Sequence, residues 1–140
     1  TSLKQFINDI DASDKDTIVV FFGDHQPPSS VTLEAGDVDE KDTAQFFKVP
    51  YFIHANFAMK SGTDMNLSPN YLGIQALKCA GITLNPYLTW VDQLRESFPS
   101  ISAVQVTDTD KTTVLESKED ISTWPKLEEY QNLQYWNLTD

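Results

Sequence analysis

One stretch constrains the fold of this chain more than any other: residues 17–28, which read TIVVFFGDHQPP. An unbroken apolar run is typical of a strand covered on both faces, as in the parallel sheets of α/β proteins. The run ends in Gly-Asp-His, and two prolines then prevent the strand from continuing. We therefore predict that Thr17–Gly23 is a central, parallel strand flanked by helices, with Asp24 and His25 at its mouth.

The length and composition allow one ordinary domain, or a piece of a larger one. The chain has 140 residues, of which 40% are hydrophobic, enough to form a core. A net charge of −11 argues against nucleic acid or anionic lipid as a direct partner, because both require a cationic surface. The first residue, Thr1, is not an initiator, so we expect this sequence to come from the middle of a protein, which leaves room for a membrane segment or signal outside it.

The first half of the chain predicts a helix and two strands. Ser2 and Gln5 have the spacing of a capping box, and an apolar stripe follows at helical spacing. A second strand is predicted in VPYFIHANF, residues 49–57. Between the two strands, residues 29–48 are rich in Asp and Glu. They favour a solvated loop over a metal-binding cluster, because no regular ligand spacing is present.

The second half predicts three helices and a hairpin. One helix starts at Ser68–Pro69 and ends at Gly81, and Cys79 within it suits a small buried side chain. A second helix is predicted from Asn85–Pro86 to before Pro99. A hairpin follows, formed by SAVQVT and TTVLES around the turn DTDK. A last helix is predicted at 125–137, with four apolar or aromatic residues on one face: Leu127, Tyr130, Leu133 and Trp136. Helices and strands in this order suggest an α/β layered fold.

Asp24 and His25 are the first side chains beyond the buried run, where α/β proteins commonly place functional groups. A carboxylate oxygen and an imidazole nitrogen together suit manganese or zinc better than magnesium or calcium. The same pair could instead form a hydrogen-bonded turn, and a catalytic metal normally takes at least three protein ligands. The other histidine, His54, lies within the second strand and favours a core or edge position over a ligand.

The segment TIVVFFGDHQPP resembles the one that carries the late metal-ligand pair in sulfatase-like enzymes of the alkaline phosphatase superfamily. Within that superfamily the chain is most similar to the lipoteichoic acid synthase and phosphoglycerol transferase family. Further segments resemble that family in the same order: VPYFIHANF, the helix pair from NLSPNYLGIQALKCAG through TWVDQLRESFPSISA, and the closing LEEYQNLQYWNLTD. The resemblance is weakest in the acidic segment and at the hairpin tip.

The resemblance implies a C-terminal portion of an alkaline phosphatase-like α/β fold: a mixed sheet flanked by helices, with a terminal hairpin and helix, over residues 1–140. It makes Asp24 and His25 two ligands of a catalytic divalent cation, manganese above all, with magnesium or zinc as alternatives. It places the remaining glutamate ligand and the nucleophilic threonine upstream, so no catalytic nucleophile is assigned within this chain. His54 stands where the family has an aromatic residue and receives no catalytic role. Asn56 matches a family asparagine, but no role follows for it.

By the same resemblance, the whole enzyme is anchored outside a Gram-positive bacterium. Its threonine attacks a phospholipid such as phosphatidylglycerol, and a glycolipid or polymer hydroxyl then accepts the glycerophosphate. This chain alone is expected to be inactive, and its unpaired sheet edges favour self-association. Two alternatives stay open. The first is a sulfatase, phosphodiesterase or phosphoethanolamine transferase on the same fold, and the second is a non-catalytic domain that binds the cell envelope.

Overall fold

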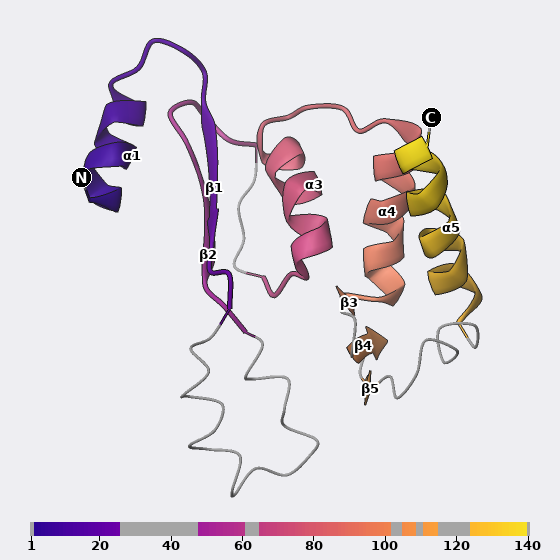
Figure 1. Cartoon of the computed structure of the whole chain (residues 1–140). Coiled ribbons are helices and arrows are strands. Elements are labelled where there is room, and N and C mark those ends of the chain that lie inside the picture. The colour runs from indigo at the N-terminus through magenta and orange to yellow at the C-terminus, as the bar shows by residue number, and fades with distance from the viewer. Residues whose placement is uncertain are drawn as a thin grey trace, which may run out of the picture. The chain divides into compact units, whose positions relative to one another are not determined.

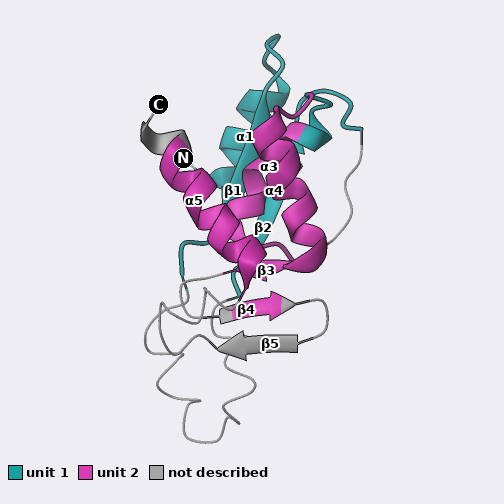
Figure 2. Ribbon diagram, turned by 90° about the vertical axis from the view of Figure 1, so that its right-hand side faces the viewer, with its two compact units in different colours: residues 1–62, 78–82 teal, residues 63–77, 83–140 magenta. Residues whose placement is uncertain are grey.

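The computed structural model describes residues 2–25, 48–60, 65–101, 105–108, 111–114 and 124–139 (Figure 1). Its elements are, in order, α1 (Leu3–Asp11), β1 (Ile18–Phe22), β2 (Tyr51–Ala55), α3 (Pro69–Cys79), α4 (Pro86–Ser97), β3 (Ser100–Ile101), β4 (Gln105–Asp108), β5 (Lys111–Val114) and α5 (Pro125–Thr139). They form two compact units (Figure 2). Unit 1 comprises Thr1–Gly62 with Lys78–Ile82, and unit 2 comprises Thr63–Leu77 with Thr83–Asp140. The α/β class predicted from the sequence is confirmed.

Strands β1 and β2 of unit 1 pair antiparallel, with Ile18 opposite Ala55 and Phe22 opposite Tyr51. The prediction of a central, parallel strand in a mixed sheet is therefore wrong for the described residues, whose two sheets are both antiparallel. Phe21 and Phe22 remain 40% and 54% exposed. The physical reason is that an apolar run records a tendency to be covered, but it carries no information about strand direction.

Helix α1 begins as its capping signal predicts. The Ser2 hydroxyl oxygen accepts a hydrogen bond from the Gln5 backbone N–H at 3.2 Å. Its apolar stripe, however, is not buried: Leu3 and Phe6 are 43% and 45% exposed, and no residue of the helix is fully buried. The cap and the periodicity fix where this helix forms, while its packing depends on other contacts.

Unit 2 has an apolar core. Its fully buried members come from α3, α4, β4, α5 and the residue that follows α4: Tyr71, Ile74, Val91, Leu94, Phe98, Val106, Leu127 and Tyr130. The predicted boundaries of α3 and α4 are confirmed. Asn85 caps α4 by accepting from the Leu88 N–H at 2.8 Å. Gly81 follows α3 with a φ of 72°, a left-handed conformation that glycine adopts without strain.

The predicted hairpin is confirmed as β4 and β5, which pair antiparallel with Asp108 opposite Lys111. The sequence did not predict β3, which pairs with the other edge of β4. Helix α5 also forms, but Trp136 is 63% exposed, so its predicted place on the buried face is wrong. Residues spaced by three rotate about 60° per step around a helix of 3.6 residues per turn. The stripe that starts at Leu127 has therefore turned to the opposite side by Trp136.

Candidate metal centre

Asp24 and His25 lie just beyond the end of β1, as predicted. Gly23 separates them from the strand, and its N–H donates to the Pro50 carbonyl at 3.0 Å. A Cβ on Gly23 would lie 3.0 Å from the Val49 Cβ, which is tighter than ordinary van der Waals contact. Glycine at this position thus lets the two chain segments approach closely immediately before the Asp-His pair.

The two side chains lie close together and face solvent. The Asp24 Oδ2 and His25 Nε2 atoms are 3.6 Å apart, and the side chains are 95% and 71% exposed, respectively. A metal ion bound at about 2.1 Å from each atom can bridge donors up to about 4.2 Å apart. The 3.6 Å between Asp24 Oδ2 and His25 Nε2 is within this limit, and an oxygen with a nitrogen suits manganese or zinc.

The described residues supply only this pair of ligands. Among them, no group of three or more His, Cys, Asp or Glu side chains gathers closely enough to hold a metal ion. The acidic segment 29–47 lies outside the described residues, so its alternative as a metal cluster stays untested. The pair alone leaves most of a cation's coordination positions to other ligands or water.

His54 is not brought to this pair. In the ladder His54 stands opposite Val19. Val19 precedes Asp24 by five residues, a separation of about 16 Å along a strand. Its Nε2 lies 2.7 Å from Asp11 Oδ1 at the end of α1. The sequence prediction of an edge or core histidine agrees with this half-buried position, in which His54 connects α1 to β2.

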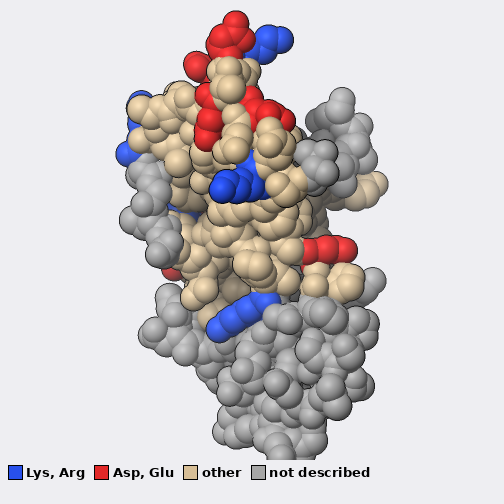
Figure 3. All heavy atoms as spheres, turned by 90° about the vertical axis from the view of Figure 1, so that its left-hand side faces the viewer, with Lys and Arg blue, Asp and Glu red and all other residues tan. Residues whose placement is uncertain are grey.

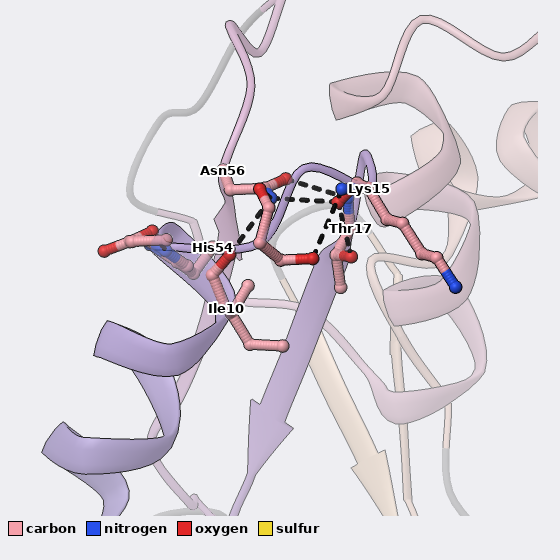
Figure 4. Close-up of polar contacts among 7 residues, drawn as sticks. Ile10, Lys15, Thr17, His54 and Asn56 are labelled. Atoms are coloured by element: carbon pink, nitrogen blue, oxygen red, sulfur yellow. Dashed lines mark hydrogen bonds and ion pairs between the residues drawn. The ribbon is translucent and has the colours of Figure 1, made fainter.

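Asn56 has a defined structural role that the sequence analysis left open (Figure 4). Its Oδ1 accepts from the Thr17 N–H at 2.8 Å. Its Nδ2 donates to the carbonyls of Ile10, Ser13 and Lys15 at 3.0, 3.2 and 2.9 Å. One side chain thus organises the whole connection between α1 and β1. Two features of the sequence could have indicated this role. Asn56 directly follows a predicted strand, and the backbone carbonyls of the polar segment DASDKD require hydrogen-bond donors.

The surface near this connection is mainly acidic. Asp9, Asp11, Asp14 and Asp16 are all exposed, with Lys15 among them. Figure 3 shows acidic side chains gathered toward the top of this face, with a few basic side chains near them.

Two observations compare the chain with known proteins. A family model described as Sulfatase matches residues 1–82, which is more than half of the chain and includes Asp24, His25, His54 and Asn56. No curated protein and no solved structure matches the chain. None of the described helices combines the length and the apolar character needed to cross a membrane.

Proposed function

The chain belongs to the sulfatase family, and we propose that it forms the C-terminal part of a metal-dependent phosphoglycerol transferase within that superfamily. Enzymes of the superfamily are generally metal-dependent and hydrolase-like. The observation that carries the proposal is the Asp24–His25 pair, whose donor atoms lie 3.6 Å apart just past the end of β1. In this proposal, the upstream nucleophile and the remaining ligands belong to the same catalytic domain.

The narrower assignment to phosphoglycerol transfer rests on three segments, of which the first lies within the family match and the other two lie beyond it. NLSPNYLGIQALKCAG, TWVDQLRESFPSISA and LEEYQNLQYWNLTD resemble the lipoteichoic acid synthase branch, in the same order along the chain. In the structure they contribute α3, α4 and α5. They bring no further ligand to the pair, so they support the branch assignment by sequence alone.

The two side chains have distinct roles in the proposed centre. Asp24 contributes a negative charge that offsets the charge of a cation, and His25 contributes a neutral nitrogen through Nε2. A divalent cation held by them supplies Lewis acidity and lowers the pKa of a hydroxyl group in contact with it. Because both side chains face solvent, they can reach a phosphodiester without any opening of unit 1.

We further propose a phospholipid donor, a glycolipid or polymer acceptor, and a location at the outer face of a bacterial membrane. The acidic surface is compatible with this location, because an anchored enzyme does not depend on electrostatic attraction to anionic lipid. Copies of this chain are proposed to associate through the edges of the β1–β2 ladder, which pair with no other strand among the described residues. Exposed Phe22 beside those edges supports this, and sedimentation velocity over a dilution series tests it.

A manganese titration tests the metal assignment directly. Sub-stoichiometric Mn²⁺ should broaden the NMR signals of the His25 imidazole first, and Asp24→Ala should weaken this effect at least about tenfold by removing a charged ligand. Asp14→Ala is the matched control, because Asp14 is an exposed aspartate of the same unit outside the motif. Equal broadening in Asp24→Ala and wild type would refute the proposed centre.

The reaction class needs the enzyme that contains this chain together with its nucleophile. We expect that enzyme to release diacylglycerol from phosphatidylglycerol and to lose this activity in His25→Ala. The family match equally accommodates a sulfatase or a phosphodiesterase. Cleavage of an aryl sulfate with no action on the phospholipid would favour a sulfatase, and metal-independent binding to cell walls would favour a non-catalytic domain.

A further inference from the structure

We propose that Asn56 is a positioning residue that sets the register of β1 against β2 and so fixes where Asp24 and His25 emerge from the ladder. The consequence for metal binding rests on the proposed function, whereas the register itself does not. The side chains of β1 specify the register only weakly, whereas the side-chain amide of Asn56 specifies it strongly.

The side-chain pattern of β1 cannot align the ladder by itself. All five residues of the strand, Ile18–Phe22, are apolar, so the alternation that normally distinguishes one register from another is missing. A slip of two residues would keep the same faces and move Asp24 by about 6.6 Å relative to β2. A specific contact is therefore needed to hold the observed alignment.

Asn56 supplies that contact at the end of the ladder opposite the metal pair. The next pair beyond Ile18 and Ala55 is Thr17 with Asn56. The Asn56 backbone N–H donates to the Thr17 carbonyl at 3.2 Å. The Thr17 N–H donates to the Asn56 side-chain Oδ1 at 2.8 Å, where a regular antiparallel pair would use the backbone carbonyl.

The same amide group prevents slippage through its Nδ2 donors. They contact the carbonyls of Ile10, Ser13 and Lys15 within 3.2 Å. Figure 4 labels Ile10 and Lys15 among these partners of Asn56. A shifted β1 would carry Thr17 away from Asn56 and pull the preceding connection with it. The contacts would then be lost together, and the partly buried amide would lose its partners.

The end of the ladder near Asp24 and His25 has fewer directional contacts that oppose a slip of β1 against β2. Gly23 N–H donates to the Pro50 carbonyl at 3.0 Å, but Pro50 has no N–H with which to return the bond. The stacked rings of Phe21 and Phe52, with centroids 5.1 Å apart, favour the same register without a directional hydrogen bond. The alignment that reaches Asp24 is thus held mainly from the Asn56 end.

Asn56→Asp tests the inference with nearly the same shape. The variant keeps an oxygen for the Thr17 N–H but turns a second oxygen toward the three carbonyl oxygens to which Nδ2 donates in wild type. Wild type should show an NMR cross peak between the α protons of Val20 and Ile53, which lie opposite each other. We expect Asn56→Asp to lose this cross peak and to exchange the amides of Val19–Phe22 at least about tenfold faster.

Asn8→Asp is the matched control, because Asn8 is an exposed asparagine of unit 1 and the charge change is identical. It should keep the Val20–Ile53 cross peak. Retention of that cross peak and of slow exchange in Asn56→Asp would overturn the proposal. If Asn56→Asp does not fold, Asn56→Ala decides: loss of the cross peak with unit 2 folded supports the proposal, and retention overturns it.

Manganese adds a readout that a loss of stability alone would not move. In wild type, Mn²⁺ alone should broaden the Tyr51 amide more than the Ala55 amide, because Tyr51 lies at the metal end of β2. In folded Asn56→Asp this gradient should flatten while His25 still broadens, and an unchanged gradient would count against the proposal. If Mn²⁺ does not broaden His25 in wild type, the proposed metal centre fails, while the α-proton cross peak still decides the role of Asn56.

Discussion

Each of the two units is stabilised by a different kind of internal contact. Unit 2 buries large apolar side chains from helices and a strand, with Tyr71 and Val106 at 1% exposure each. In unit 1, by contrast, Cys79 is the single fully buried hydrophobic residue among those described, and β1 and β2 are only partly covered. Its long-range order comes instead from the strand ladder, the amide of Asn56 and the side-chain contact between His54 and Asp11.

The contrast matters because the candidate metal ligands lie in unit 1. Regions with few buried apolar contacts open at lower free energies than a packed core does. Polar contacts give direction and register but little net stability, whereas apolar burial gives stability with little directionality. The candidate site therefore combines precise local alignment with low expected resistance to opening.

The largest expected effect comes from the same substitution placed in each unit. Leu94→Ala removes a side chain that is 2% exposed and should lower the free energy of unfolding of unit 2 by about 2–5 kcal/mol. Leu3→Ala, at a site 43% exposed in unit 1, should change stability by about 0.5 kcal/mol or less. Amide exchange across both units measures the two changes, and equal losses would remove the contrast.

Tryptophan fluorescence reports on unit 2 separately, because all three tryptophans, Trp90, Trp124 and Trp136, belong to it. Denaturant titrations followed by this signal therefore measure the apolar core without interference from the ladder. Unit 1 must be followed by NMR or amide exchange. Each prediction about one unit thus has a readout that the other unit does not dominate.

A smaller effect is expected for Tyr71→Phe. The Tyr71 hydroxyl donates to the Phe98 carbonyl at 2.7 Å, so its removal should cost about 1–3 kcal/mol at neutral pH by leaving that carbonyl unpaired. Burial raises the pKa of Tyr71 to about 12, which is above its ordinary value near 10. The folded state then holds its proton more tightly than the unfolded state between these two pH values.

The contribution of Tyr71 is complete below pH 10 and is lost as the pH rises toward about 12, because only the unfolded chain readily releases the proton. The difference in unfolding free energy between wild type and Tyr71→Phe should therefore shrink over this range. Tyr135→Phe, at a residue 67% exposed, controls for general alkaline effects. A constant difference would contradict the burial of Tyr71.

Local signals predicted the element boundaries well, because they act within a few residues. The Ser2 and Asn85 caps, the proline at the start of α3 and the glycine after it all function as their chemistry requires. Asp24 and His25 were also placed correctly at the end of a strand, since the change from an apolar run to Gly-Asp-His marks that end in any topology.

Features set by distant partners could not be predicted. The direction of β1 depends on which strand it meets, and its own residues are apolar whichever way it pairs. The role of Asn56 depends on carbonyls about 40 residues away in sequence. Trp136 shows a different limit: a spacing of three mimics an apolar face over two turns, but it drifts around the helix over the full length of α5.

The contact between His54 and Asp11 in unit 1 should contribute less to stability than the burial of Leu94 in unit 2. Asp11→Asn keeps the shape of a side chain whose Oδ1 lies 2.7 Å from His54 Nε2 but removes its charge. Because both side chains are partly exposed, we expect a loss of about 0.2–1 kcal/mol, seen as faster amide exchange in α1 alone. Asp9→Asn, two residues earlier in the same helix and also exposed, is the control. Loosening of unit 2 in Asp11→Asn would show that the units are not stabilised separately.

The smallest effect on stability is expected at the candidate metal ligands. Asp24 and His25 are 95% and 71% exposed, and they contact each other at 3.6 Å, so their removal creates neither a cavity nor a buried unpaired group. Asp24→Ala and His25→Ala should each change the free energy of unfolding by about 0.5 kcal/mol or less without metal. With Mn²⁺, wild type alone should gain stability, because an ion that binds only the folded state shifts the equilibrium by mass action. Amide exchange of Val19–Phe22 with and without Mn²⁺ measures both.

If the variants unfolded unit 1 without metal, Asp24 and His25 would be residues that stabilise a turn, as the structural alternative holds. If Mn²⁺ protected wild type and variants equally, the ion would be acting elsewhere.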